Sequence, residues 1–280
     1  MLEAQPGTPP RLRTAYAVQV RRGWVLAGNT SGDDSQVVTW TANDKGDVSG
    51  PIDQVGAIEF SFFVGARGGE VALLGSSDNG KPLTVATVSS DGRVQTPPVA
   101  ASRVNRNGVA VAVQDGFLVA TGVDWPMNSS PKLEIIFVSA DGKPTVVDSV
   151  IQPVAQLAWA VQGATAYLVV SAPEGVYAIP YDLRGKQQGP PLQLRSQQRP
   201  LGLVEARADR LTVLVEEDNR VVAVELRLTG ARGRIRETPL LGLGEQQLPL
   251  GSGFRYRGGL YLFSQHHKRK ETSINRLEPR

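Results

Sequence analysis

A short turn that contains glycine recurs at nearly regular intervals along the whole chain. The glycines are Gly46, Gly92, Gly142, Gly185 and Gly233, so successive turns are 46, 50, 43 and 48 residues apart. A period of this length indicates an array of small supersecondary units that bury their apolar faces against one another. The chain has 280 residues, and the period runs through it without a break. We therefore expect a single repeat domain.

Each repeat contains four short apolar segments separated by turn residues. In the first two repeats these segments span residues 16–20, 24–27, 36–40 and 48–55, then 58–64, 71–74, 83–88 and 94–99. Segments rich in Val, Ile, Thr and aromatic residues, bounded by Gly, Asp, Asn and Pro, are typical of β-strands. Residues 152–162 are rich in Ala and Leu, but Pro153 favours a strand there too. The sequence predicts an all-β fold with four antiparallel strands per repeat, and Trp24, Trp40 and Trp159 lie within strands as expected core residues.

The sixth repeat has only three segments, and a matching fourth segment lies at the other end of the chain. A proline follows the marker glycine in the first five repeats, as suits an outer strand, where proline removes an exposed hydrogen-bond donor. Residues 96–98, Thr-Pro-Pro, have a copy at residues 8–10. We expect this N-terminal segment to form the outer strand of the last repeat, beside residues 273–277. The alternative is a proline-rich tether without a fixed partner.

Four short antiparallel strands per repeat, at this spacing, resemble the blades of a β-propeller. The resemblance covers the whole chain and implies a six-bladed β-propeller whose last blade is closed by the N-terminal strand. The expected blades span approximately residues 13–56, 57–103, 104–152, 153–198, 199–243, and 244–280 together with 4–12. The sharp blade signatures, such as a Trp-Asp dipeptide at the repeat ends, do not occur. The resemblance therefore carries over no functional residue.

Charge is distributed unevenly along the chain. Residues 1–183 carry 12 Lys and Arg against 17 Asp and Glu, a net −5, whereas residues 184–280 carry 18 against 10, a net +8; the sum is the formal +3. If the blades follow one another in sequence order, one sector is basic and the other acidic, which would steer a charged partner. The alternative is a solvated surface without consequence. The basic run at residues 232–236 has no interleaved aromatic residue, so we do not expect nucleic-acid binding.

Cysteine is absent, which excludes disulfides, thiolate nucleophiles and Cys-ligated metal sites. A chain without thiols suits an oxidising compartment. We therefore expect an extracytoplasmic protein of the bacterial periplasm or cell surface, resembling a lipoprotein, although no export signal follows Met1; the alternative is the cytoplasm. No apolar run is long enough for a transmembrane helix. We expect a monomer without a cofactor or metal.

Asp124, Trp125 and Met127 lie on the longest apolar segment among the loops that join second and third strands. Exposed Trp and Met on a loop favour contact with a protein partner or the face of a sugar ring. The alternative is that Trp125 folds back onto its own blade. We take these three residues as one candidate partner-binding site.

A second candidate is the basic loop that contains His266, His267, Lys268, Arg269 and Lys270. Three adjacent cations would suit phosphate or an acidic partner. Adjacent residues of an extended strand point to opposite faces, and no carboxylate stands at ligand spacing, so a metal site is not expected. A solvated basic loop is the alternative.

These features together predict a non-enzymatic binding or scaffold propeller that mediates protein–protein interaction. Propeller hydrolases and lactonases need converging acidic, amide or imidazole groups around the central channel. The innermost strands offer few polar residues: Glu59, Asn105, Gln156, Glu205, Arg255 and Tyr256. We therefore expect no catalytic residues. The alternatives are a hydrolase or lactonase with a channel site, and a carbohydrate-binding lectin that uses Trp125.

Overall fold

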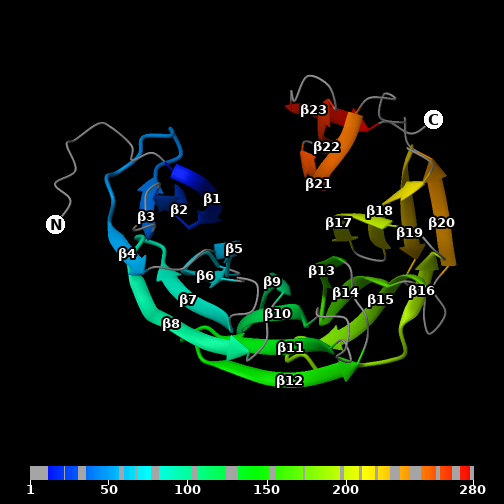
Figure 1. Ribbon diagram of the computed structural model, residues 1–280, viewed down its shortest axis with the longest axis horizontal. Helices are drawn as coiled ribbons and strands as arrows, with labels where there is room; N and C mark the ends of the chain where they lie inside the picture. The colour runs from blue at the N-terminus through cyan, green and yellow to red at the C-terminus, as the bar shows by residue number, and fades with distance from the viewer. Residues whose placement is uncertain are drawn as a thin grey trace. The chain divides into compact units, whose positions relative to one another are not determined.

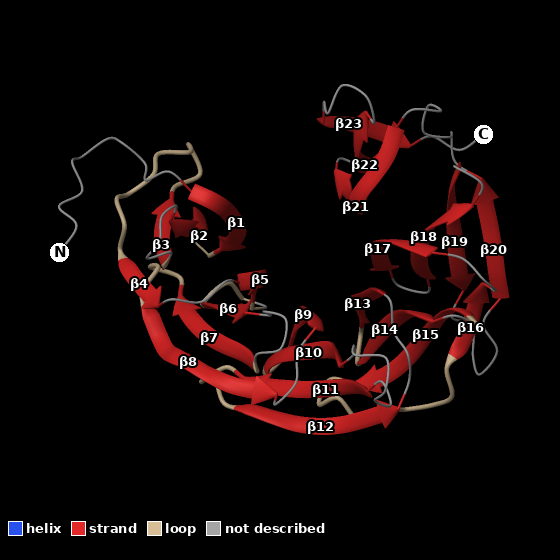
Figure 2. Cartoon of the chain, viewed as in Figure 1, coloured by secondary structure: helices blue, strands red, loops and turns tan. Residues whose placement is uncertain are grey.

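The computed structural model shows a chain built from short β-strands (Figure 1). It describes residues 12–21, 23–30, 36–56, 60–66, 68–76, 82–102, 106–123, 132–151, 156–172, 174–195, 199–207, 210–217, 220–227, 234–239, 247–256, 259–266 and 272–277. These residues form strands joined by turns and loops, and none of them is in a helix (Figure 2). Residues 1–11, which contain the expected closing strand, lie outside the described residues.

The chain divides into two compact units, and the first contains residues 1–152 and 183–186. This unit holds three four-stranded antiparallel sheets, each in sequence order across the sheet. The first sheet is β1 (Leu12–Val20), β2 (Gly23–Thr30), β3 (Val37–Ala42) and β4 (Asp53–Gly56). The second is β5 (Phe60–Gly65), β6 (Val71–Ser76), β7 (Leu83–Ser89) and β8 (Val94–Ser102). The third is β9 (Arg106–Val113), β10 (Gly116–Val123), β11 (Lys132–Ser139) and β12 (Pro144–Ile151).

The second unit contains residues 153–182 and 187–280 and repeats the same arrangement. The fourth sheet is β13 (Gln156–Gln162), β14 (Thr165–Ala172), β15 (Gly175–Asp182) and β16 (Leu192–Arg195). The fifth is β17 (Arg199–Arg207), β18 (Arg210–Glu217), β19 (Arg220–Arg227) and β20 (Arg234–Pro239). The sixth has three strands among the described residues: β21 (Gln247–Tyr256), β22 (Gly259–His266) and β23 (Thr272–Leu277).

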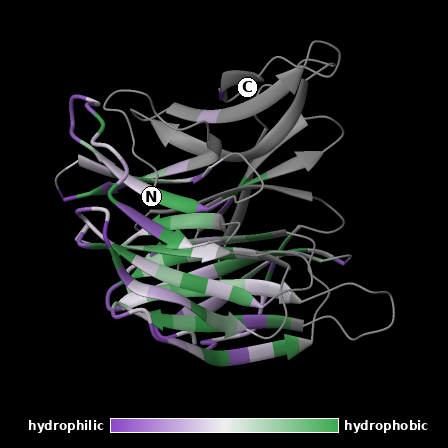
Figure 3. Ribbon diagram, turned by 60° about the vertical axis from the view of Figure 1, so that its left-hand side comes forward, coloured by the Kyte–Doolittle hydropathy of each residue, from purple (hydrophilic) through white to green (hydrophobic). Residues whose placement is uncertain are grey.

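Alternation of side chains along each strand builds the core between successive sheets. Val25 and Ala27 of β2 are fully buried, and in their cluster they meet Ala72 and Leu74 of the second sheet. A further cluster joins the second and third sheets, and another joins the fourth and fifth. Figure 3 shows apolar residues along the described strands and hydrophilic residues in many of the connecting turns. Within the first unit β1 contacts β5 and β5 contacts β9, so the first strands of successive sheets are neighbours.

The predicted all-β architecture with four-stranded antiparallel sheets is confirmed, including a strand, β13, in the Ala-rich segment. The prediction of a strand over residues 48–55 was wrong in its extent, because β4 spans only Asp53–Gly56. Residues 48–52 lie along β3 without forming a regular strand: Val48 forms an isolated bridge with Ala42, and the N–H groups of Ser49 and Ile52 donate to backbone carbonyl oxygens of β3. Trp40 and Trp159 are buried as predicted, whereas Trp24 is 40% exposed.

Candidate functional site

Most residues of the two predicted loop sites lie outside the described residues. Asp124, Trp125 and Met127 follow the end of β10 and belong to residues 124–131. His266 is the last residue of β22 and stands opposite Gln247 in the strand register. His267, Lys268, Arg269 and Lys270 come after it, again beyond the described part of the chain.

In its own unit, each predicted site belongs to the connection between a second and a third strand. We call this end of a sheet the loop end. A polar contact crosses there from the second sheet to the third, since Ser102 Oγ at the end of β8 donates a hydrogen bond to Glu134 Oε2 near the start of β11. Ser102 is buried, and Glu134 stands opposite the buried Thr121 in the register. Sequence reasoning missed this pair, because nothing in two strands 32 residues apart signals that their side chains meet.

At the opposite end of the sheets lie the marker turns, which join third and fourth strands; we call this the turn end. The marker glycines Gly46, Gly92, Gly142 and Gly185 have φ values of 88°, 84°, 80° and 87°. This left-handed conformation strains any residue with a Cβ atom and so favours glycine. The recurrence of glycine in the sequence therefore has a local backbone cause in each described turn.

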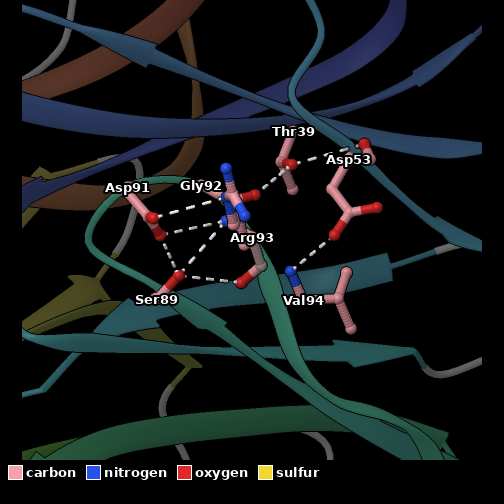
Figure 4. A network of polar contacts seen from close by, with 7 residues as sticks. All are labelled: Thr39, Asp53, Ser89, Asp91, Gly92, Arg93 and Val94. Atoms are coloured by element: carbon pink, nitrogen blue, oxygen red, sulfur yellow. Dashed lines mark hydrogen bonds and ion pairs between the residues drawn. The ribbon is translucent and has the colours of Figure 1, made fainter.

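The second marker turn also docks onto the first sheet (Figure 4). Thr39 Oγ1 of β3 donates a 2.5 Å hydrogen bond to the carbonyl oxygen of Gly92. Asp53 Oδ2 of β4 accepts a 2.9 Å hydrogen bond from the backbone N–H of Val94. A Cβ atom at Gly92 would lie 2.9 Å from Ile52 Cδ1, the end of a flexible side chain, so here the positive φ is the stronger reason for glycine.

The third marker turn docks onto the second sheet in the same way. Thr96 Oγ1 of β8 donates a 2.8 Å hydrogen bond to the carbonyl oxygen of Asp141. A Cβ atom at Gly142 would lie 2.6 Å from Thr96 Oγ1 and 2.7 Å from Thr96 Cβ. Glycine is therefore favoured at position 142 for two reasons: its φ is positive, and the neighbouring sheet leaves no space for a Cβ atom.

The marker turn at residues 183–186 lies against the third sheet, and it belongs to the same compact unit as that sheet. A Cβ atom at Gly185 would lie 2.5 Å from Val147 Cγ2. Arg184 Nη2 lies 2.8 Å from Asp115 Oδ2, and its guanidinium carbon lies 4.8 Å from the centre of the Phe137 ring. An ion pair and a cation–π contact therefore secure this turn to the third sheet.

Short-range electrostatics stabilise the second and third turns internally. The hydroxyl of Ser89 donates a hydrogen bond to the Asp91 carboxylate. This hydrogen bond, together with the nearby Arg93, holds the pKa of the Asp91 carboxyl below its ordinary value. Lys143, 2.8 Å from Asp141, and the Ser139 hydroxyl lower the pKa of Asp141, while Asp141 raises the pKa of Lys143.

The described residues contain no group of three or more His, Cys, Asp or Glu that could hold a metal ion. Nor does the described chain contain a helix long and apolar enough to cross a membrane.

Four-stranded antiparallel sheets, whose first strands are neighbours within each unit, define the class: the fold is a β-propeller. The periplasmic gluconolactonase of Pseudomonas aeruginosa matches with a TM-score of 0.61 and 13% identity, over 95% of this chain and 83% of that chain. The β-propeller domain of the Trilobed protease from Pyrococcus furiosus matches with a TM-score of 0.58 and 11% identity, over 94% and 83%.

The acylaminoacyl peptidase of Pyrococcus horikoshii is also similar, with a TM-score of 0.55 and 10% identity over 91% of this chain. The present chain covers 43% of that peptidase chain. No protein-family model and no curated protein sequence matches. At these identities the likeness shows the fold alone.

Proposed function

We propose that the protein is a non-enzymatic binding scaffold whose loop end receives a protein partner. The observation that supports this most directly is the docking of successive marker turns onto the preceding sheet, through Thr39, Thr96 and Arg184. The first two contacts fix the first three sheets to one another at the turn end. Loops on such a rigid scaffold can vary without loss of the fold, and we assign the partner to the connections at the loop end.

Trp125 and Met127 are the residues that we assign to the partner contact, with Asp124 beside them, and the basic segment 266–270 is a second contact. A protein partner is preferred to a carbohydrate because Trp and Met together suit a mixed apolar surface, whereas a sugar needs flanking hydrogen-bonding groups. We also propose a monomer that works outside the cytoplasm, consistent with a chain that has no cysteine.

Two of the described first strands favour binding over hydrolysis. From residue 108 to residue 113, β9 carries only glycine, valine and alanine, and from 157 to 161 β13 carries leucine, alanine, tryptophan and valine. A lactonase or glycosidase requires carboxylates or other polar groups that converge on its substrate. The similarity to a gluconolactonase is one of fold, and it makes lactone hydrolysis the alternative to be tested.

The test uses the double variant Trp125→Ala/Met127→Ala in quantitative cross-linking and pull-down from an envelope extract of the source organism. The matched control is Arg93→Gln/Lys143→Gln, which alters two exposed residues at the turn end. We expect one partner to be enriched by the wild type and the control and lost with the loop variant. Hydrolysis of a lactone or ester panel by the wild type, at a rate well above background, would instead establish an enzyme.

We further propose that the six sheets are six blades of a closed ring, with the N-terminal segment as the fourth strand of the last blade. Trp24, Ala72 and Phe117 occupy equivalent positions, each opposite the residue that lies four positions before the marker glycine. Ala72 and Phe117 are fully buried in clusters shared with the preceding sheet, whereas Trp24 is 40% exposed. An apolar sheet face of this kind needs a cover, and ring closure supplies one.

The Trilobed protease propeller is described as having an open velcro topology, and closure by the N-terminal strand is the contrasting arrangement that we propose here. Since the chain has no cysteine, Thr8→Cys combined with Ser273→Cys, Asn275→Cys or Leu277→Cys gives a clean cross-linking test. We expect one of these pairs to form a disulfide in high yield. Removal of residues 1–12 should also lower the melting temperature, and unchanged melting together with no cross-link would exclude the closing strand.

A further inference from the structure

The outer strand of the third sheet, β12, has an open edge. Within its sheet β12 pairs with β11 on one side, and its other side faces away from the sheet (Figure 1). Thr145 and Ser149 are exposed, and so are Val146 and Val147, at 48% and 39%. In the described part of the chain, no residue outside the third sheet forms a backbone hydrogen bond with β12. An unpaired edge of this kind can accept a further strand.

Proline protects the outer strands of the neighbouring sheets. It occupies the fifth position after the marker glycine in the first, second and fourth sheets, as Pro51, Pro97 and Pro190. Proline has no N–H group to donate, so it blocks the addition of a strand. β4 and β16 are also only four residues long. In the third sheet the same position is Val147, and Pro144 lies three residues earlier, at the start of β12.

The outer strand of the fifth sheet, β20, is protected by charge. It carries Arg234, Arg236 and Glu237, and its last residue is Pro239. Charged side chains on an edge strand discourage pairing with another chain. Of the five outer strands in the described residues, β12 alone combines a length of eight residues with no proline after its first position and no Lys or Arg.

A β-bulge interrupts β12 without closing its edge. Val147 has no register partner on β11, whereas Val146 stands opposite Ile136 and Asp148 opposite Ile135. Irregularities of this kind also occur in the outer-strand pairing of the first, second and fourth sheets, which have the proline as well. From residue 148 to residue 151 the strand is again in regular register with β11. This stretch and the two exposed valines before it give six residues, the usual length of one strand.

Asp148 gives this edge a negative charge. Its Oδ1 atom accepts a 2.8 Å hydrogen bond from the N–H of Ser149, and none of the ion pairs between described residues involves it. Residues directly opposite in an antiparallel pair interact, so a Lys or Arg of an added strand would face Asp148 favourably. A second copy of β12 has no Lys or Arg to supply this charge, and Lys143, just before it, is paired with Asp141. The charge therefore favours a different, basic strand over a second copy.

We infer that the edge of β12 binds an extended segment of a protein partner, which adds to the third sheet as a fifth strand. The segment carries β-branched residues, which suit pairing beside Val146 and Val147, and a Lys or Arg opposite Asp148. Backbone hydrogen bonds hold the segment, and its side chains determine which segment is selected. The site is an outer strand, whereas residues 124–127 belong to the connection between β10 and β11. The inference therefore does not rest on the proposed function.

The test is selection of phage-displayed random dodecapeptides on the whole chain, followed by fluorescence anisotropy with the selected peptides made synthetically. We expect the selected peptides to alternate β-branched residues around a Lys or Arg. Two copies of the best peptide then carry N-methyl groups on odd and on even backbone nitrogens. Only the copy whose methyl groups face β12 should bind at least about tenfold more weakly, because an added strand uses one of its two edges. Equal binding of both copies, or no enriched peptide of this pattern, would overturn strand addition.

The discriminating variant is Val147→Pro, which introduces the proline found at this position in three other sheets. It removes an N–H group from the edge and should weaken peptide binding at least about tenfold. The matched control, Val147→Thr, keeps the N–H group and a β-branched side chain, and should bind within about threefold of the wild type. One methyl group of Val147 also faces the fourth marker turn, so the melting temperatures of both variants are compared. Equal peptide binding by the two folded variants would contradict the assignment.

A charge exchange at Asp148 provides a second test that does not introduce proline. Asp148→Lys should reverse the preference between a selected peptide and a copy with Glu in place of its basic residue, by roughly fivefold in each direction. An unchanged preference would overturn the placement of the basic residue. The Trp125→Ala/Met127→Ala variant should keep peptide binding, which separates this site from the loop end. A wild-type dimer in analytical ultracentrifugation that Val147→Pro converts to a monomer would make a second copy the occupant and overturn the proposal.

Discussion

Replacement of Gly142 by alanine tests whether the marker turns stabilise the fold through contact with the preceding sheet. Gly142 has a φ of 80°, and its new Cβ atom would lie 2.7 Å from Thr96 Cβ, an atom fixed to the backbone of β8. Neither atom can move without displacing a strand or a turn. The hydrogen bond from Thr96 Oγ1 to the carbonyl of Asp141 would be strained by the same displacement.

Two costs add in this variant. The left-handed conformation costs alanine about 1–2 kcal/mol relative to glycine. Overpacking against Thr96 costs about 1–3 kcal/mol more. We therefore expect Gly142→Ala to lower the free energy of unfolding by about 2–5 kcal/mol in total.

Gly163→Ala is the matched control, because it isolates the conformational cost. Gly163 also has a positive φ, 56°, but no described atom lies within 4 Å of its Cβ position. Urea denaturation of both variants, followed by circular dichroism, should show the Gly142 variant less stable by about 1–3 kcal/mol. Equal destabilisation of the two variants would refute the idea that turn docking stabilises the sheets.

Three further predictions follow from the same contacts. Gly46 has a φ of 88° and no described atom within 4 Å of its Cβ position. In a closed ring its turn would also contact a neighbouring sheet, so Gly46→Ala should lower the free energy of unfolding more than Gly163→Ala does. Equal urea midpoints of the two variants would count against ring closure. The pKa of the Asp141 carboxyl is lowered in the folded state from 3.8. The ionised carboxylate therefore stabilises the fold above pH 3.8, and this stabilisation is lost as the pH falls through the folded-state pKa. Asp141→Asn should make the melting temperature less sensitive to acid below about pH 4. Arg184→Lys keeps the positive charge but removes the planar contact of the guanidinium with the Phe137 ring. A double-mutant cycle with Phe137→Leu should give a coupling free energy of about 0.5–1 kcal/mol. Zero coupling would assign the contribution of Arg184 to its ion pair with Asp115 alone.

Strand positions could be predicted from the sequence because each strand is short, apolar and bounded by turn residues. The predicted segment 83–88 corresponds to β7, Leu83–Ser89, and the strand predicted within 152–162 corresponds to β13. The first outer strand was predicted too long, since valines at 48 and 55 suggested a continuous strand. Residues 48–52 pair with β3 only through an isolated bridge and single hydrogen bonds, and apolar content does not signal this irregularity.

The contacts between sheets could not be predicted in the same way. Thr39 and Gly92 are 53 residues apart, and Ser102 and Glu134 are 32 apart. No spacing rule connects residues on different sheets, because their meeting depends on how far each sheet is rotated against the next. The sequence did show glycine at each marker turn, but only the structure shows that Gly92, Gly142 and Gly185 also face a neighbouring sheet.

Connections at both ends of the sheets vary in length, so length alone does not decide what each end can bind. Between third and fourth strands they span residues 43–52, 90–93, 140–143 and 183–191 in the first four sheets, and between second and third strands they run from residues 173–174 to residues 124–131. The marker turns of the second, third and fourth sheets contact the preceding sheet although their connections differ in length. Docking therefore depends on the few residues around the marker glycine, and additional residues of a connection are accommodated outside this contact.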